Sequence, residues 1–311
     1  MLPIGGSELQ EKLLYKYVDN TLLGEFEITI SVPEKKPLSD HKINILWVQN
    51  SYDQPNLIEW FKNKDNHKKY SWYVFNSHWC YEKFRMTYNL PTHRCAVIKN
   101  AIEHFPEVKK HNKDDEIKMI FHPTPWRGLN VILGAMQLIK KDNITLDVYS
   151  STQIYGDRFK EQNDDEYKSL YDQAEKLKNV NYKGWHDNDY ITKNISNYKI
   201  FPYSNIWEET SCISAIEALG AGLHMISTNY GALFETCSEW PVYVQYDNNY
   251  KNLSTCFAYA IEGVTDYLHT DNMHDYLKKQ RDFYERFYNW KFRKNEWTNF
   301  LSGVLDEHKK Q

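Results

Sequence analysis

The chain alternates short apolar segments with helix-like segments from beginning to end, and this alternation limits its fold more than any other feature. The segment INILWV (43–48) is mostly apolar and has the length of a buried strand, and WYVF (72–75) and IKMIF (117–121) are similar. Segments with helical spacing separate these runs. Strands that are joined by helices pair in parallel, so the sequence predicts an α/β fold with parallel sheets.

The amino-terminal third gives two further local predictions. A helix is expected over 7–19, where Ser7 and Gln10 have the spacing of a capping box. Apolar and polar residues alternate over 26–32, which is typical of a half-exposed strand. The later part of the chain predicts two βαβ units, the first over 117–149 and the second over 199–227.

At 311 residues the chain is long enough for two compact α/β domains. The charged stretch PEVKKHNKDDEIK is typical of a linker, which sets the boundary near Lys110. We therefore expect an amino-terminal Rossmann-like domain over 1–110 and a carboxy-terminal one over 111–285. A last helix over 286–311 is expected to pack back toward the first domain.

Composition restricts the compartment and the partners. The 38 basic and 42 acidic residues give a formal net charge of -4, which disfavours nucleic acid as a partner but leaves a local basic patch open. The five cysteines are odd in number and lack C-x-x-C spacing, so a reducing, cytoplasmic location is expected. No apolar run is long enough to cross a bilayer, although peripheral membrane contact stays open.

Two polar turns follow predicted strands, PTPWRG (123–128) and SNIWEET (204–210). In open α/β sheets, ligands bind beyond the carboxyl ends of the strands, where helix N-termini attract anions. Arg127 would add a guanidinium suited to a diphosphate, or it is a solvated surface arginine. His122 could hydrogen-bond a phosphate, or it is a loop histidine with local partners.

Glu217 is the most informative single residue. The segment SCISAIEALGAGL (211–223) contains no other charged residue, so its helix is expected to be nearly fully buried. A buried carboxylate needs polar partners, and the two hydroxyls of a nucleotide ribose would supply them. A salt bridge to a basic residue elsewhere is the alternative. Glu209, in the loop before this helix, is expected to be solvent-accessible, where it would face a ligand or stabilise the helix dipole.

The stretch PYSNIWEETSCISAIEALGAGLHMISTNYGALFET closely resembles the signature of retaining glycosyltransferases of family 4. Two glutamates separated by seven residues precede a small-residue helix, a strand and a turn with a third glutamate, and Glu209, Glu217 and Glu235 match in that order. The segments FHPTPWRGLNVILGAMQLI, VIKNAIE and YNWKFRKNEWTNFL resemble further segments of the family in order. The resemblance covers nearly the whole chain.

The resemblance implies a GT-B fold, in which two Rossmann-like domains face each other across a cleft. It also implies an enzyme that moves a sugar from a nucleotide-sugar donor, UDP-sugar or GDP-sugar, to an acceptor hydroxyl with retention of configuration. No metal or other cofactor is expected, because a basic side chain and a helix dipole would stabilise the leaving phosphate. The implied catalytic residues are Glu209 and Arg127, and the implied donor-binding residues are Glu217, Thr210, Ser211, Cys212, Gly5, Gly6 and His122.

Two departures from the family pattern concern the amino-terminal domain. Only Met1–Ile4 precede the Gly5-Gly6 pair, so the family's first strand is expected to be missing or reduced to a stub. Gln49 stands on the acceptor side, where many members carry a histidine. An amide can hydrogen-bond but cannot act as an acid or a base.

Two alternatives stay open, of which the first rests on the two-domain fold that some DNA-modifying glucosyltransferases share and the second on these departures. The acceptor, which is unknown, could be a hydroxymethylated DNA base in place of a glycan or lipid. The chain could also be a non-catalytic protein that binds a sugar-nucleotide or a glycan. Hydrolysis of a donor would separate the enzymes from the binding protein.

Overall fold

A computed structural model describes residues 5–310, which form two compact units. The amino-terminal unit contains 6–103, 208–211 and 287–310, and the carboxy-terminal unit contains residue 5, 104–207 and 212–286. The two units therefore meet in sequence at Glu103, earlier than the expected Lys110, and the short segment 208–211 belongs to the amino-terminal unit. The predicted stub before Gly5 lies outside the described residues.

The amino-terminal unit has a four-stranded parallel sheet with the order β1-β2-β3-β4. Its strands are β1 (Phe26–Ile30), β2 (Ile43–Val48), β3 (Trp72–Phe75) and β4 (Cys95–Val97). Its helices are α1 (Gly6–Tyr17), α2 (Asn20–Leu23), α3 (Pro55–Lys62), α4 (His78–Tyr88) and α13 (Trp290–His308).

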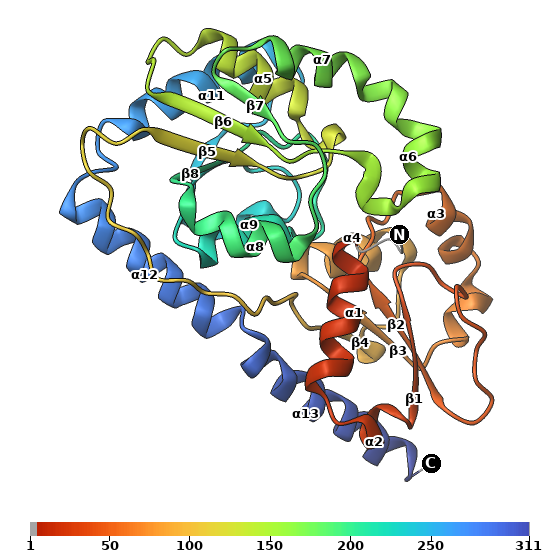
Figure 1. Ribbon diagram of the computed structural model, residues 1–311. Coiled ribbons are helices and arrows are strands. Elements are labelled where there is room, and N and C mark those ends of the chain that lie inside the picture. Colours follow the sequence, from red (N-terminus) through yellow and green to blue (C-terminus); the bar gives the residue numbers. More distant parts are fainter. Residues whose placement is uncertain (1–4, 311) are drawn as a thin grey trace. The chain divides into compact units, whose positions relative to one another are not determined.

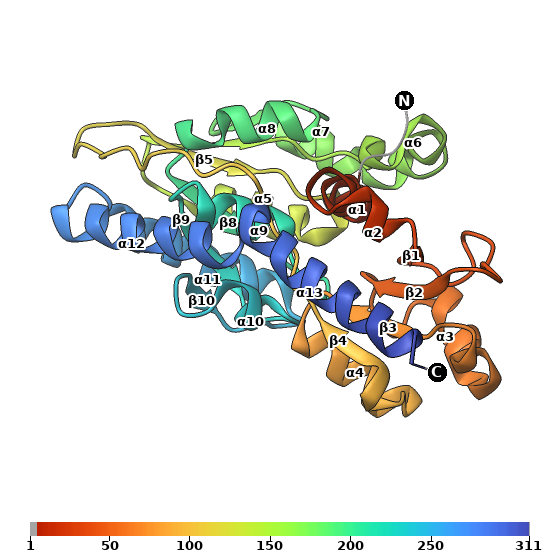
Figure 2. The ribbon, with the colours of Figure 1, turned by 90° about the horizontal axis from the view of Figure 1, so that it is seen from below.

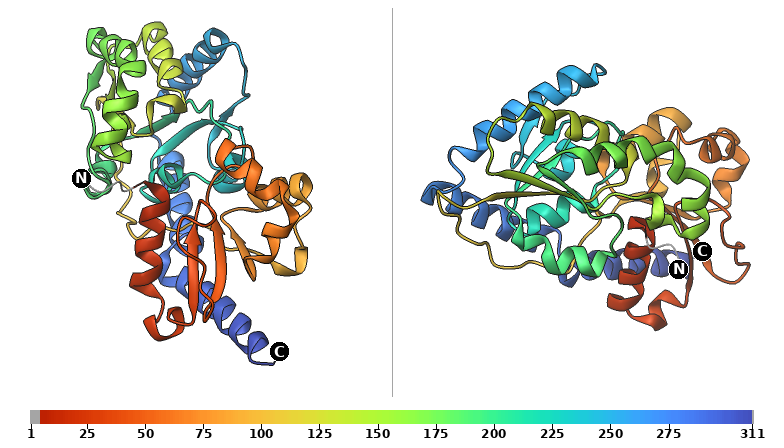
Figure 3. Two further views of the ribbon diagram at one scale, coloured as in Figure 1. Left: turned by 90° about the vertical axis from the view of Figure 1, so that its right-hand side faces the viewer. Right: turned by 45° about the horizontal axis from the view of Figure 1, so that its top comes forward.

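Helices cover both faces of this sheet (Figure 3). On one face, α1 and α13 pack on β1 and β2, and the ring of Trp297 meets the ring of Trp47 edge-on at 4.7 Å. On the other face, Phe61 of α3 and Phe84 of α4 pack together with a ring distance of 4.9 Å. Because both faces are covered, β1 is mostly buried, and the prediction of a half-exposed strand was wrong.

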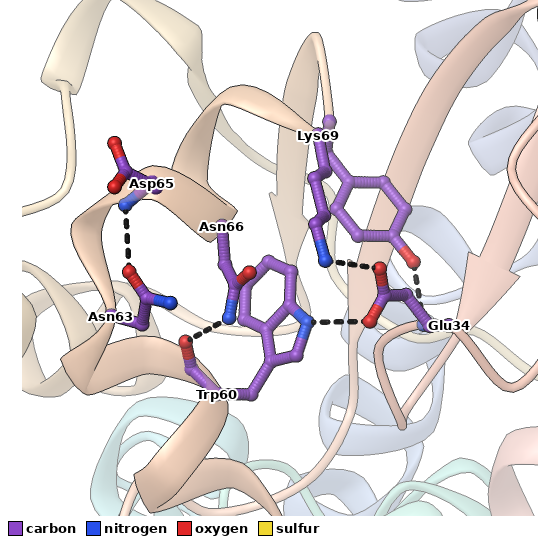
Figure 4. A network of polar contacts seen from close by, with 7 residues as sticks. Glu34, Trp60, Asn63, Asp65, Asn66 and Lys69 are labelled. Atoms are coloured by element: carbon purple, nitrogen blue, oxygen red, sulfur yellow. Dashed lines mark hydrogen bonds and ion pairs between the residues drawn. The ribbon is translucent and has the colours of Figure 1, made fainter.

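A polar network secures the loop that follows β1 (Figure 4). Lys69 Nζ lies 2.6 Å from Glu34 Oε1, and Trp60 Nε1 donates to the other carboxylate oxygen at 3.2 Å. The hydroxyl of Tyr70 accepts from the backbone N–H of Glu34 at 2.8 Å. The hydrogen bond from Lys69 holds the pKa of the Glu34 carboxyl below its ordinary value. These bonds fix a residue with a φ of 57°, a left-handed value that non-glycine residues adopt infrequently.

The carboxy-terminal unit has a six-stranded parallel sheet with the order β10-β9-β8-β5-β6-β7. Its strands are β5 (Ile117–Phe121), β6 (Ile144–Val148), β7 (Val180–Tyr182), β8 (Ile200–Tyr203), β9 (His224–Thr228) and β10 (Val242–Val244). Its helices are α5 (Leu129–Leu138), α6 (Asp157–Asn163), α7 (Lys168–Lys176), α8 (Asn188–Asn194), α9 (Ile213–Gly220), α10 (Leu233–Cys237), α11 (Tyr250–Thr265) and α12 (Asp271–Phe287). The order reverses between β5 and β8, which is where doubly wound sheets bind ligands.

The helices of this unit lie on both faces of the sheet. Helices α5 and α11 lie side by side (Figure 1), and the hydroxyl of Ser254 on α11 donates to the carbonyl of Val131 on α5 at 2.9 Å. Helix α12 runs beside α9 (Figure 2), where the buried amide of Gln280 donates to the carbonyls of Leu219 and Leu223 at 3.0 Å each. The predicted α/β fold with parallel sheets and both predicted βαβ units are thus confirmed.

One amino-terminal prediction was wrong in detail. Helix α1 begins at Gly6, so Ser7 lies inside the helix and does not precede it. The fully buried side chain of Gln10 donates to the carbonyl of Ala101 at 2.8 Å and accepts from its N–H at 3.1 Å. Gln10 therefore ties α1 to the segment after β4 instead of capping the helix.

Candidate functional site

The two polar turns lie against each other at the reversal point of the carboxy-terminal sheet. They follow the adjacent strands β5 and β8, and the hydroxyl of Ser204 donates to the carbonyl of Gly128 at 2.8 Å. Gly128 has a φ of 98°, and a Cβ built on it would lie 1.9 Å from the carbonyl oxygen of Ser204. Only glycine fits this position, which lets the two backbones approach each other.

Arg127 and His122 both lie on the first of these turns. Arg127 ends a single turn of 3-10 helix, Pro125–Arg127, where its guanidinium donates to the hydroxyl of Thr124 at 2.6 Å and lies 5.9 Å from the ring centre of Trp126. His122 follows β5 with its ring 5.1 Å from that of Phe201, and its buried Nε2 has no hydrogen-bond partner in the described part of the chain. Burial lowers the pKa of His122 to about 4, so the imidazole is neutral at pH 7.

Glu217 is buried in α9, as the sequence predicts. Its side chain is 5% exposed, and Asn188 Nδ2 donates to its Oε1 at 2.7 Å. The carboxylate thus has a neutral amide as its partner, and no basic side chain among residues 5–310 forms a salt bridge with it. Burial raises the pKa of Glu217 to about 7, although the hydrogen bond from Asn188 opposes that rise.

Asn188 is a site residue that sequence reasoning missed. It begins α8 directly after Asp187, whose carboxylate caps the helix by accepting from the N–H of Tyr190 at 2.7 Å. The segment HDND (186–189) has the polar composition of a solvated loop, but its last two residues lie in α8. An N-cap aspartate followed by a short helix was the signal that could have placed Asn188 on an ordered element.

The three residues whose backbone N–H groups the resemblance implies as donor contacts directly precede α9. Cys212 is the N-cap of the helix and is buried, while Thr210 and Ser211 precede it. The N-cap side chain makes no capping hydrogen bond to this helix. Glu235, the third glutamate of the signature, is half-buried on α10.

The amino-terminal unit places three amide side chains at the carboxyl ends of neighbouring strands. We call Gln49, Asn76 and Asn100 the amide cluster; they follow β2, β3 and β4. Gln49 Nε2 donates to Asn100 Oδ1 and Asn100 Nδ2 donates to Gln49 Oε1, both at 3.0 Å. Asn76 Nδ2 donates to Gln49 Oε1 at 3.1 Å. Both polar atoms of Gln49, the predicted acceptor-side residue, are therefore engaged within the cluster.

Glu209 lies in this unit, on the segment 208–211. Its side chain is 5% exposed, so the prediction of a solvent-accessible carboxylate was wrong. The next residue, Thr210, is hydrogen-bonded to Gln49, Asn76 and Ser77, so contacts distant in sequence hold this segment against the amino-terminal sheet. Of the predicted glycine pair, Gly5 is buried, and Gly6 is the exposed first residue of α1.

Two further observations bear on the surroundings of these residues. None of the five cysteines, all of which lie within residues 5–310, forms a disulfide bond, and Cys256 on α11 is exposed. Among the helices described over 5–310, none has the length and apolar character needed to span a bilayer.

Solved structures share this architecture at low sequence identity. A glycosyltransferase from Rickettsia africae is 15% identical with a TM-score of 0.68, over 96% of this chain and 80% of that one. Sucrose-phosphate synthase from Thermosynechococcus elongatus is 12% identical with a TM-score of 0.67, over 96% and 79%. The Anabaena protein Alr3699/HepE, solved in complex with UDP, is 14% identical with a TM-score of 0.62, over 84% and 72%. The fold is therefore that of the GT-B glycosyltransferases.

The sequence itself identifies the family. The model of the family described as glycosyl transferases group 1 matches residues 99–278, more than half of the chain. The chain belongs to this family and is a glycosyltransferase. No curated protein sequence matches it significantly.

Proposed function

We propose that this glycosyltransferase moves a sugar from a nucleoside diphosphate sugar to an acceptor hydroxyl, with retention of configuration and without a metal ion. The buried carboxylate of Glu217 is the observation that carries the proposal. It lies in an apolar helix with one neutral hydrogen-bond donor, Asn188, at 2.7 Å. A carboxylate accepts more than one hydrogen bond, and the two hydroxyls of a ribose supply the donors that an apolar helix lacks.

A UDP-sugar is the favoured donor, and a GDP-sugar is the alternative. The support for uridine is the Anabaena protein of the same fold, which has been solved with UDP and with UDP-glucose. In our proposal the diphosphate binds at the turn after β5. There Arg127 neutralises its charge and the neutral imidazole of His122 offers a hydrogen bond. The N–H groups of Thr210, Ser211 and Cys212 and the backbone of the Gly5-Gly6 pair are further proposed contacts of the donor.

The proposed chemistry is a front-face substitution at the anomeric carbon. The bond from that carbon to the diphosphate oxygen breaks, and the acceptor oxygen bonds to the carbon from the same face. The acceptor proton passes to the departing phosphate oxygen. Arg127 and the α9 N-terminus stabilise the negative charge that develops on the phosphate. Glu209 is proposed to bind hydroxyls of the donor sugar, and Gln49 to lie on the acceptor side as a hydrogen-bonding group.

Donor turnover tests this proposal. The protein is screened with UDP, GDP and ADP by thermal shift. It is then incubated with the corresponding sugars, and release of the nucleoside diphosphate and the anomeric configuration of the released or transferred sugar are followed by NMR. We expect UDP release that persists in EDTA and an α-configured product from an α-linked donor. Glu209→Ala should abolish turnover while nucleotide affinity changes less, and Glu217→Ala should weaken nucleotide binding.

One observation favours a second candidate, a protein that binds a sugar-nucleotide without turning it over. Gln49 stands where many family members carry a histidine, and both its polar atoms are engaged by Asn76 and Asn100. Nucleotide binding with no hydrolysis or transfer, across the donor panel and with simple sugars as acceptors, would support this candidate and overturn the catalytic one.

A further inference from the structure

The segment 208–211 is held by hydrogen bonds on both the side chain and the backbone of Thr210. Asn76 Nδ2 donates to Thr210 Oγ1 at 3.1 Å, and that hydroxyl donates in turn to the carbonyl of Gln49 at 2.8 Å. The hydroxyl of Ser77 donates to the carbonyl of Thr210 at 2.5 Å. All of these groups lie in the amino-terminal unit, and Asn76, Ser77 and Thr210 are at most 6% exposed.

We propose that Asn76 is a positioning residue for the sugar transfer. Through Thr210 it fixes the backbone from which Glu209 extends. This inference rests on the proposed function, because it assigns a catalytic consequence to the placement of Glu209. An amide nitrogen has two N–H groups, and Asn76 uses one on Gln49 and the other on Thr210. Asn76 therefore joins the amide cluster to the glutamate segment.

The amide oxygen of Asn76 argues against a role for this residue that is limited to stabilising the fold. Asn76 Oδ1 is buried and has no hydrogen-bond partner in the part of the chain that the structure describes. A buried acceptor without a partner destabilises a fold, and an apolar side chain of similar size would avoid that loss. The contribution of Asn76 thus lies in its two donors, one of which acts on the residue next to Glu209.

A second tether of the segment is weaker. Lys83 Nζ on α4 lies 3.7 Å from Glu208 Oε1, and both side chains are partly exposed. Exposed ion pairs contribute little to the placement of a backbone. The hydrogen bonds of Thr210 therefore hold the backbone next to Glu209 more firmly than this ion pair does.

The test combines kinetics with a double-mutant cycle on Asn76→Ala and Thr210→Val. A displacement of about 1 Å lowers turnover by about 10²-fold. We expect each single variant to lose kcat on this scale with donor KM changed by less than about twofold. The double variant should be no slower than either single variant, since both act through one bond. Thr210→Ser, which keeps the hydroxyl, should recover most of the rate.

The matched control is Asn44→Ala. Asn44 lies at the other end of β2, where its amide donates to the carbonyl of Ser39 at 2.8 Å and accepts from the N–H of Ser39 at 2.9 Å. Removing it deletes a hydrogen-bonded amide from the same sheet, far along the strand from Gln49. We expect kcat to stay within about twofold of the parent, since no positioned group depends on it.

Hydrogen exchange of peptides that cover 208–211 gives a readout that does not need activity. Exchange should accelerate in Asn76→Ala and Thr210→Val and stay at the parent rate in Asn44→Ala. Parent turnover in Asn76→Ala, additive losses in the double variant, or unchanged exchange would each overturn the inference while leaving the proposed function in place. A parent protein that turns over no nucleotide-sugar would overturn the proposed function and, with it, the catalytic role given to Asn76.

Discussion

Asn188 Nδ2 and Glu217 Oε1 are 2.7 Å apart, and this hydrogen bond joins the first residue of α8 to the middle of the apolar helix α9. The bond gives a buried carboxylate a neutral partner. The carboxylate therefore keeps most of its desolvation penalty, which is why the pKa of Glu217 is raised to about 7. The carboxyl of Glu217 titrates near neutral pH, and its charged form can accept further hydrogen bonds. Binding of a ligand that donates to it should therefore depend on pH.

Nucleotide affinity should rise with pH across neutrality. In the proposed site the carboxylate form of Glu217 would accept from both ribose hydroxyls, whereas the protonated form would have lost part of that capacity. With a pKa of about 7 for Glu217, the charged fraction increases about tenfold between pH 6 and pH 8. UDP affinity measured by calorimetry over this range should increase by up to this factor. The same titration of Glu217→Gln should be flat, and a parent profile that is equally flat would contradict the assignment.

Glu217→Gln should stabilise the protein without ligand at pH 8 while it weakens nucleotide binding. The folded-state pKa of about 7 lies above the ordinary value of 4.5, so the folded state binds the proton more tightly. The contribution of Glu217 to the free energy of unfolding therefore falls as pH rises from about 4.5 to about 7 and is constant above that. A shift of this size corresponds to about 3 kcal/mol at most. Urea unfolding of parent and variant at pH 5 and pH 8 checks this, and a variant less stable than the parent at pH 8 would refute it.

Asn188→Ala should move the pH dependence of UDP binding to higher pH. The amide stabilises the charged form of Glu217, so its removal raises the pKa of that carboxyl further. Asn181→Ala is the matched control, because Asn181 Nδ2 donates to Asp147 Oδ1 at 2.8 Å elsewhere in the same unit. The midpoint of the affinity profile should shift in the first variant and not in the second. Equal midpoints in both variants and the parent would remove Asn188 from the site.

Gly128→Ala should disrupt the phosphate side of the proposed donor site. The new Cβ would meet the carbonyl oxygen of Ser204 at 1.9 Å, and the φ of 98° strains any other residue. We expect a loss of about 1–3 kcal/mol in unfolding free energy and a marked loss of UDP affinity. Gly263→Ala in α11 is the control, because nothing lies within 4 Å of its Cβ. That variant should be more stable than the parent by roughly 0.5–1 kcal/mol and bind UDP normally.

The features that the sequence predicted most clearly are the strands and buried helices, which depend on local patterns of apolar residues. The bounds of β2, β3 and β5 match the predicted segments, because a strand buried on both faces is mostly apolar along its length. The burial of Glu217 followed from the same kind of argument. The alternation of apolar and polar residues around β1 gave a wrong prediction of exposure. Such a local pattern does not show which faces of a sheet are covered by helices distant in sequence, such as α13.

The contacts that define the site depend on chain segments that are far apart. Asn188 meets Glu217 across 29 positions, and Thr210 meets Asn76 across 134. The spacing of apolar residues in the sequence does not predict either pair, because each pair forms only when the strands are ordered in their sheets. The exposure of Glu209 was misjudged for this reason, since 208–211 belongs to the amino-terminal unit although it lies between two parts of the other one.

The central claim, that Glu217 holds the ribose of a nucleotide, is tested most directly by removing the ribose hydroxyls. The affinities of UDP and of its 2′,3′-dideoxy analogue are measured by calorimetry at pH 8 for the parent and for Glu217→Gln. Hydrogen bonds to a charged group contribute about 1.5–3 kcal/mol, so the parent should prefer UDP by at least about tenfold and the variant by much less. Equal preferences in the two proteins would show that the carboxylate of Glu217 does not bind the ribose.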